Sequence, residues 1–387
     1  MKRWPIKKIG ECADVQMGQS PPGETYNSDR IGLPFFQGKA EFGEEYPTAV
    51  KWCSQPSRVA DAGDILLSVR APVGPTNFAL EKCCIGRGLA AIRAKANSCN
   101  QRFLSYYLKR FETDIAAQGV GSTFSAINRA DIERLELPVP PLAEQERIAK
   151  LLDEADVLRR LGVQADRRTA VFLPAVFDEL FGDPGHNPMR WPKRKLRELC
   201  EKISDGPFGS NLKSSNYAQE GVRVIRLQNI GVGHLIDEDR AYISLEHFGR
   251  LRKHECLPGD VVVGTLGDPN LRACILPPDI PRALNKADCV QIRPHGEIAT
   301  AEFVCWLLNL PSMRALASGM IFGQTRSRIS MGRLAELVVP VPPLPLQKEF
   351  ARRVTEFRAL EAKQIASRVR LDALFQSMLH GAFRGEL

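Results

Sequence analysis

Side chains able to form paired hydrogen bonds gather in loops at corresponding places in the two halves of the sequence. Arginine donates two parallel hydrogen bonds to guanine, and the amide of asparagine or glutamine both donates to and accepts from adenine. The candidates in the first half are Gln37, Lys39, Arg70, Arg87, Ser122, Thr123 and Asn128. Those in the second half are Asn211, Lys213, Arg226, Gln228, Asn229, Asn270, Arg272, Gln324, Thr325 and Arg326. This chemistry predicts contact with a nucleic acid.

These candidates do not carry equal weight. We expect Arg70 and residues 121–125 to matter most in the first half, and Gln228 with residues 323–327 in the second. For each residue the alternative is a side chain that stays solvated or contacts only a phosphate. Loss of a base-reading residue relaxes the preference at one target position, whereas loss of a phosphate-binding residue weakens binding to all sequences alike.

Motifs that carry catalysis are missing from the sequence. There is no G-x-x-x-x-G-K-[ST] phosphate loop. The segment Ser20-Pro21-Pro22-Gly23 resembles the base-stacking loop of amino-methyltransferases, but a glycine occupies the aromatic position and a turn is the better interpretation. The ten cysteines form no C-x-x-C pair, and the six histidines show no ligand spacing. We therefore expect no catalytic residue, no metal site, no cofactor in this chain and mostly buried free thiols.

Length and charge fit a large globular protein. A chain of 387 residues has room for two or three domains, and its formal net charge of +8 favours a polyanionic partner without requiring one. No uncharged apolar run approaches the roughly 20 residues that span a bilayer. We expect a cytoplasmic protein that does not bind a membrane.

The sequence contains one plan twice. Residues 137–149, LPVPPLAEQERIA, return as residues 339–351, VPVPPLPLQKEFA. Trp4-Pro5 returns as Trp191-Pro192, and Ala62-Gly63-Asp64 returns as Pro258-Gly259-Asp260. The landmarks keep their order over about 200 residues, which indicates a duplicated domain rather than a solenoid of short repeats.

Each half combines short strands with helices and ends in a proline-rich strap. Enrichment in β-branched residues predicts strands at 65–69, 90–93, 222–227 and 261–263, and apolar spacing predicts helices at 101–117 and 301–317. A long amphipathic stretch follows each strap, and Pro174 predicts a kink or a second segment in the first. The predicted class is α/β (α+β), with a pseudo-two-fold internal repeat.

The long stretches are predicted to be spacer helices that pack on each other as an antiparallel coiled coil. This gives a first globular domain at 1–141, a first spacer helix at 142–182, a second domain at 188–343 and a second spacer helix at 344–387. The alternative is that each helix packs on its own domain. The residues expected to pack between helices, or against a partner, are Ile148, Leu151, Leu152, Leu158, Phe350, Val354 and Phe357.

The strap and helix at 137–153 resemble the hallmark of the specificity subunit of type I restriction–modification systems. Leu180-Phe-Gly-Asp183 before Trp191-Pro192 resembles a junction in that family, and residues 381–387 resemble its C-terminal segment. Arg70-Ala-Pro-Val-Gly74 and Ile85-Gly-Arg-Gly88 are similar to one type of its recognition domains. The second helix departs from the pattern, because it opens with Pro345-Leu-Gln-Lys-Glu, which leaves its docking partner less certain.

The resemblance implies two target recognition domains that each read half of a bipartite, asymmetric target in double-stranded DNA. It implies two modification (methyltransferase) subunits as partners, with the methyl donor, and motor–nuclease restriction subunits, with ATP and Mg²⁺. Three alternatives stay open. They are a recognition subunit whose partner fuses methylation and cleavage, an autonomous DNA methyltransferase or nuclease, and a coiled-coil adaptor that binds no nucleic acid.

Overall fold

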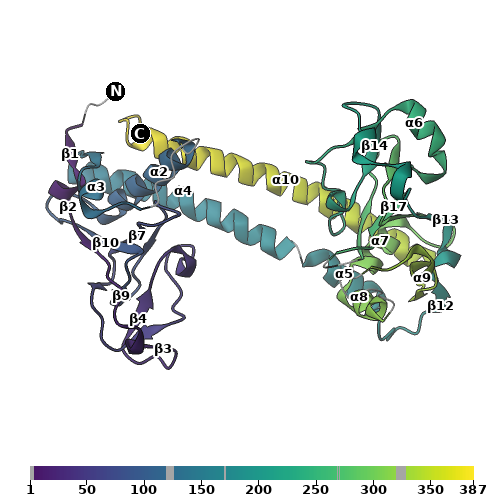
Figure 1. The fold of residues 1–387 in the computed structure, drawn as a ribbon, viewed down its shortest axis with the longest axis horizontal. Helices are drawn as coiled ribbons and strands as arrows, with labels where there is room; N and C mark the ends of the chain where they lie inside the picture. The colour runs from purple at the N-terminus through teal and green to yellow at the C-terminus, as the bar shows by residue number, and fades with distance from the viewer. Residues whose placement is uncertain (1–3, 119–125, 170, 268, 270, 320–327) are drawn as a thin grey trace. The chain divides into compact units, whose positions relative to one another are not determined.

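The computed structural model describes residues 4–118, 126–169, 171–267, 269, 271–319 and 328–387. It divides into two compact units (Figure 1). Unit 1 comprises Met1–Gln164 with Ile365–Leu387, and unit 2 comprises Ala165–Gln364. Two long helices, α4 (Leu142–Thr169) and α10 (Leu344–Ala382), contribute residues to both units.

Unit 1 contains two sheets and a two-stranded strap. The first sheet has the order β2 (Ala13–Met17), β10 (Leu89–Ala94), β7 (Ile65–Ser68), β8 (Thr76–Phe78), and all its pairs are antiparallel. The second has the order β3 (Tyr26–Asn27), β5 (Trp52–Cys53), β4 (Leu33–Phe36), β9 (Cys83–Ile85), β6 (Val59–Ala60). The strap pairs β1 (Ile6–Lys8) with β11 (Glu136–Pro138). The helices are α1 (Ile9–Cys12), α2 (Gln101–Gln118) and α3 (Arg129–Glu133).

Unit 2 repeats the first sheet and the strap, and its second sheet has four strands where that of unit 1 has five. Its first sheet has the order β13 (Cys200–Ser204), β20 (Cys289–Pro294), β17 (Val261–Gly264), β18 (Arg272–Ile275). Its second has the order β15 (Tyr242–Ile243), β14 (Val222–Ile225), β19 (Ala283–Asn285), β16 (Glu255–Cys256). The strap pairs β12 (Lys193–Lys195) with β21 (Val338–Pro340). The helices are α5 (Phe172–Phe181), α6 (Leu245–Arg250), α7 (Ala301–Asn309), α8 (Pro311–Ser318) and α9 (Met331–Ala335).

The repeated tryptophan–proline pairs close the straps. The carbonyl of Pro5 accepts a hydrogen bond of 2.8 Å from the backbone N–H of Val139, and the carbonyl of Pro192 accepts one of 2.8 Å from Val341. A proline can stand at this edge because its missing N–H is not needed there, while its carbonyl still accepts. The sequence repeat is therefore a repeat of hydrogen bonding as well.

A buried glutamine fixes each strap to the start of the following helix. The side-chain carbonyl of Gln145 accepts from the backbone N–H of Asn100 at 2.8 Å, and its amide donates to the carbonyl of Pro140 at 2.8 Å. Gln347 accepts from Thr300 at 3.0 Å and donates to Pro342 at 2.8 Å. Both glutamines are fully buried, so their bonds satisfy backbone groups that water cannot reach.

An aspartate–arginine pair is also duplicated. Asp64 accepts from the Nε and Nη2 of Arg93 at 2.7 and 2.8 Å, and Asp260 accepts from the same two atoms of Arg293 at 2.8 and 2.8 Å. Each pair links the strand β7 or β17 to its neighbour β10 or β20, whose register also matches (Ile65 opposite Ile92, Val261 opposite Ile292). Two parallel hydrogen bonds hold the guanidinium in one orientation.

Each long helix packs into the core of the domain that precedes it. Ile148 and Leu152 of α4 are fully buried in the core of unit 1, which also contains Phe375 of α10. Phe350 and Val354 of α10 lie in the core of unit 2. Phe357 belongs to the same core, Leu151 is partly buried and Leu158 is 51% exposed. Leu158 is therefore not covered by another described helix, and its predicted packing against a partner stays a prediction.

The helices α4 and α10 run antiparallel within unit 1. The guanidinium of Arg159 lies 5.2 Å from the ring of Phe375, and a Cβ added at Gly162 would lie 3.8 Å from the Cγ of Arg368. Along α4 from Arg159 to Gly162, the neighbouring residue on α10 changes from Phe375 back to Arg368, so the two helices run in opposite directions. Coiled-coil geometry along the full helices remains a prediction.

Two predicted elements differ from the structure, and one predicted division is found in it. The helix predicted at 301–317 is divided at Leu310, because Pro311 has no N–H to donate and instead begins α8. The first spacer stretch is also divided, with Pro174 inside the first turn of α5, as the kink or second segment expected there. The strand predicted at 222–227 ends at Ile225, since Leu227 begins a 3-10 turn, η6 (Leu227–Asn229).

Candidate nucleic-acid interface

Four of the predicted DNA-contacting residues of unit 1 line one pocket. Gln37, Lys39, Arg70 and Arg87 come from three separate segments and surround a volume of about 350 Å³. All four side chains are exposed. Three cations and one amide thus meet at one place, with Ser20 and Ser68 completing the polar lining. We call these residues the basic pocket.

Close backbone approach requires the glycines beside Arg87. A Cβ added at Gly88 would lie 2.1 Å from the carbonyl oxygen of Gln37, and one added at Gly86 would lie 3.3 Å from the Cα of Gln37. The first distance is impossible for a real side chain, so only glycine lets the loop after β9 approach the loop after β4. This contact brings Arg87 and Gln37 to the same pocket.

A serine orients the turn that carries Arg70. The Ser68 hydroxyl oxygen lies 2.9 Å from the carbonyl oxygen of Pro72 and 3.2 Å from that of Arg70. The backbone of Arg70 also forms an isolated antiparallel bridge with Ala126. The turn is therefore held on both sides while the arginine side chain stays exposed.

The basic pocket has three cations in its lining, and a neighbouring acid is Glu41, whose carboxylate accepts from the backbone N–H of Gly38 at 3.1 Å. Of the described residues that line the pocket, none is an aspartate or a glutamate. Among the described residues, the side chains of Gln37, Lys39, Arg70 and Arg87 have no hydrogen bond or ion pair with one another or with the rest of the chain. Burial raises the pKa of the nearby Glu112, an effect that the positive charge of Lys39 opposes. The free donors of the pocket are suited to an anionic or acceptor-rich ligand.

The equivalent place in unit 2 can be located by backbone hydrogen bonds. Val69 donates to the carbonyl of Gly88, and Thr265 donates to that of Asp288, both at 2.9 Å. The isolated bridge of Arg70 with Ala126 corresponds to that of Leu266 with Arg328. By this framework Leu266 replaces Arg70.

The other two cations are replaced as well. Ala287 precedes Asp288 and so replaces Arg87, which precedes Gly88. Leu227 begins η6, as Lys39 begins the 3-10 turn η2 (Lys39–Glu41). Unit 2 therefore has apolar side chains at all three positions where unit 1 has cations.

The predicted residues around η6 are bound to one acid. Asp239 accepts from the Nη2 of Arg226 at 2.6 Å and from the side-chain amide of Gln228 at 2.8 Å. Hydrogen bonds from Gln228 and then Arg226 lower the pKa of Asp239. Gln228 is exposed, so it can reach a ligand only by sharing or leaving this acid.

Asn229 is a structural residue, and the prediction that it contacts DNA is wrong. Its side chain is fully buried. The amide donates to the carbonyls of Ile236 and Asp239 at 3.0 and 2.7 Å, and its oxygen accepts from the N–H of Arg226 at 3.0 Å. All its hydrogen-bonding groups are used inside the domain.

The remaining predicted residues lie apart from the basic pocket or outside the described residues. Asn128 caps α3, with its side-chain oxygen accepting from Asp131 at 3.1 Å. Asn211 and Lys213 are exposed in the loop before β14, and Arg272 begins β18. The residues outside the described part are Ser122, Thr123, Asn270, Gln324, Thr325 and Arg326.

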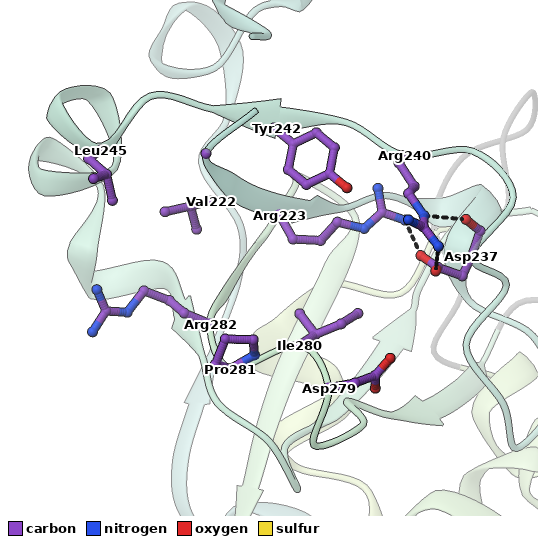
Figure 2. Close-up of a pocket in the computed structure, with 11 residues that line it drawn as sticks. Val222, Arg223, Asp237, Arg240, Tyr242, Leu245, Asp279, Ile280, Pro281 and Arg282 are labelled. Atoms are coloured by element: carbon purple, nitrogen blue, oxygen red, sulfur yellow. Dashed lines mark hydrogen bonds and ion pairs between the residues drawn. The ribbon is translucent and has the colours of Figure 1, made fainter. Parts of the chain in front are cut away.

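Sequence reasoning missed a pocket of about 450 Å³ in unit 2 (Figure 2). Figure 2 shows Asp237 beside the guanidinium groups of Arg223 and Arg240. Its carboxylate accepts hydrogen bonds of 2.9 Å from Arg223 and 2.5 Å from Arg240. Arg223 is only 4% exposed and lies 5.6 Å from the ring of Tyr242. An arginine within the strand sequence Val-Arg-Val-Ile gives no signal that it turns inward, so the sequence could not reveal this pocket.

No group of three or more histidine, cysteine, aspartate or glutamate side chains in the described ranges could hold a metal ion. Within those ranges, no helix is both long and apolar enough to cross a membrane. All ten cysteines are free, and nine are buried, which confirms the expectation of mostly buried thiols.

Comparison with solved structures identifies the fold. The chain aligns over its full length with a chain from a structure on complex assembly and conformational transition of the type I R-M system, with a TM-score of 0.66, 20% identity and 99% of that chain covered. It aligns over 98% of its length with the type I restriction-modification system S subunit from M. genitalium, with a TM-score of 0.57, 17% identity and 96% of that chain covered. The class is a mixed helix-and-sheet protein with the fold of type I specificity subunits.

Sequence comparison adds the family. Residues 1–160 match the family described as type I restriction modification DNA specificity domain. A putative type I restriction enzyme MjaX specificity subunit of Methanocaldococcus jannaschii is 45% identical over 157 residues, which cover 40% of this chain and 37% of the relative. The type I restriction enzyme EcoBI specificity subunit of Escherichia coli is 23% identical over 84% of this chain and 73% of its own length. Residues 1–160 thus resemble the DNA specificity domain of type I restriction–modification systems, and the relatives to which the chain is similar are specificity subunits of such systems.

Proposed function

We propose that this chain is the DNA-recognition subunit of a type I restriction–modification complex and that it has no catalytic role of its own. The basic pocket is the observation that carries the proposal. Three cations that have no ion-pair partner among the described residues surround one pocket, and the described lining contains no acid; this suits a polyanion whose bases also present acceptors. The similarity to specificity subunits of type I restriction enzymes supports the same role.

The target is a bipartite and asymmetric sequence in double-stranded DNA. Unit 1 and unit 2 share a backbone framework. At equivalent positions, however, unit 1 has cations and unit 2 has apolar residues, as Arg70 and Leu266 show. Two such domains would read different half-sites. The helices α4 and α10 would act as the spacer that sets the number of base pairs between them.

The partners are two modification subunits, and motor–nuclease subunits where the complex also cleaves. The methyl donor, ATP and Mg²⁺ would be bound by those subunits. Val157, Leu158 and Leu161 support a docking role for α4, because these apolar side chains are 46%, 51% and 54% exposed on one helix. Exposed apolar residues grouped in this way are typical of a surface that a partner covers.

The proposal is tested by sequencing modified bases in the source genome with and without the gene. We expect a gapped, two-part methylated motif that disappears on deletion and returns when the gene is supplied again. Co-purification of the full chain with a methyltransferase subunit is the second readout. A genome whose methylation is unchanged, together with a chain that purifies alone, would contradict the proposal.

A further inference from the structure

We infer that unit 1 reads guanine, through Arg70 and Arg87, in its half of the target. This inference rests on the proposed function and adds the base that the basic pocket selects. It begins from the choice between two roles for an exposed arginine near DNA, a phosphate contact and a base contact.

The duplication separates these two roles. The phosphate backbone of a duplex is the same at both half-sites, so two copies of one domain gain equally from a cation at a phosphate-facing position. A base-reading position differs between copies that read different bases. Arg70 and Arg87 occupy framework positions where unit 2 has Leu266 and Ala287, so their cations serve only the first half-site.

The hydrogen-bonding character of the basic pocket then selects the base. Arginine and lysine only donate, and in the major groove guanine alone presents two acceptors, O6 and N7, on one base. Adenine and cytosine each present an amino donor, which an arginine cannot accept from. Gln37 supplies an amide that can accept such a donor, so a neighbouring base read by Gln37 need not be guanine.

The loop geometry fixes the backbone from which the Arg87 side chain extends. Gly86 and Gly88 bring its backbone against Gln37, and the N–H of Arg87 lies 3.5 Å from the hydroxyl of Ser20. The backbone is therefore constrained while the side chain stays exposed. In unit 2, Ala287 is equivalent to Arg87 and is followed by Asp288, which forms an ion pair with Arg328 at 2.8 Å. Unit 2 therefore has an acid at the position of Gly88 in unit 1.

The test uses the full chain in complex with its modification subunits and a DNA library randomised across both half-sites. The wild-type complex should select at least one guanine in one half-site. Arg87→Ala and Arg70→Ala should each reduce the preference for a guanine roughly tenfold to a hundredfold at one position, with the other half-site unchanged. Arg87→Lys keeps the charge and loses the fork, so it should also relax that position.

Arg134→Ala is the matched control, because Arg134 is an exposed arginine of unit 1 that does not line the basic pocket. It should leave the selected sequence unchanged. The inference is overturned if Arg87→Ala and Arg70→Ala weaken binding to all sequences alike and reduce the salt dependence, as a lost phosphate contact does. It is also overturned if neither half-site contains guanine. A wild-type complex that selects no sequence would instead refute the proposed function itself.

Discussion

The two units are most alike where polar groups are buried and least alike where they are exposed. Asp64 with Arg93 and Asp260 with Arg293 form the same bidentate pair, with hydrogen bonds of 2.7–2.8 Å. Around the basic pocket, by contrast, Arg70 is matched by Leu266. A buried acceptor is costly to leave unpaired, so both copies keep its partner, whereas an exposed residue can change with the ligand. The buried polar positions therefore stabilise the fold, and the exposed positions are free to specify a target.

Removing the buried carboxylates is the strongest test of this comparison. Asp260→Ala should lower the free energy of unfolding by about 3 kcal/mol, because Asp260 also accepts from Gln291 at 2.6 Å and from the N–H of Leu257 at 2.7 Å. Asp64→Ala should cost less, about 2 kcal/mol, since Arg93 is half exposed and can be solvated. Urea denaturation with hydrogen exchange would report each unit.

Asp64→Asn and Asp260→Asn are the controls, since they keep the shape and one acceptor. They should recover part of the loss. If the alanine variant in one unit were neutral while that in the other were severe, the pairs would not be equivalent supports, and the shared framework would be narrower than the geometry indicates.

The sequence predicted the duplicated plan, because its landmarks coincide with backbone hydrogen bonds. Trp4-Pro5 and Trp191-Pro192 precede the straps that their carbonyls close. The repeated glutamine at 145 and 347 was also visible, although its burial was not. Strand and helix positions followed from apolar periodicity, and the exception at Pro311 follows from the missing N–H of proline.

The candidate site was predictable only by residue type. Gln37, Lys39, Arg70 and Arg87 were all named from the sequence, and the structure brings them to one pocket. Asn229 was named for the same reason and is buried, because a short 3-10 turn directs it inward. No local pattern distinguishes an asparagine that satisfies the backbone from one that contacts a ligand, so burial had to come from tertiary structure.

The contact between domain and helix differs between the units in a way that pH should expose. In unit 1, Glu45 pairs with Arg102 at 2.6 Å and with Arg160 of α4 at 2.9 Å. Burial raises the pKa of Glu45, but hydrogen bonds from Arg160 and Arg102 outweigh it and the pKa is lowered overall. In unit 2, Arg358 of α10 instead donates to the backbone carbonyl of Gly233 at 2.5 Å, which does not titrate.

Acidification should therefore weaken this contact in unit 1 only. A carboxylate whose pKa is lowered by folding contributes stability above its ordinary pKa of 4.5, and that contribution is lost as the pH falls through the lower folded value. Glu45→Gln should cost about 1 kcal/mol at pH 7, and the gap to wild type should shrink below pH 4.5. The measurement is urea denaturation of both proteins across this range. A gap that stays constant with pH would show that Glu45 acts through packing rather than charge.

The smallest expected effect concerns Asn128, which the sequence proposed as a DNA contact and the structure places as a helix cap. Its oxygen accepts from the N–H of Asp131 at 3.1 Å, as Ser330 of unit 2 accepts from Arg333 at 3.4 Å. Asn128→Ala should lower the free energy of unfolding by up to about 1 kcal/mol, Ser330→Ala by less, and Asn128→Ser should restore most of the loss, since serine also caps. Base selection measured on the randomised library should not change in any of the three variants. If Asn128→Ser keeps the stability but relaxes one position of the target, the side-chain amide of Asn128 contacts a base. Asn128 and Ser330 would then be equivalent as helix caps but not in DNA recognition.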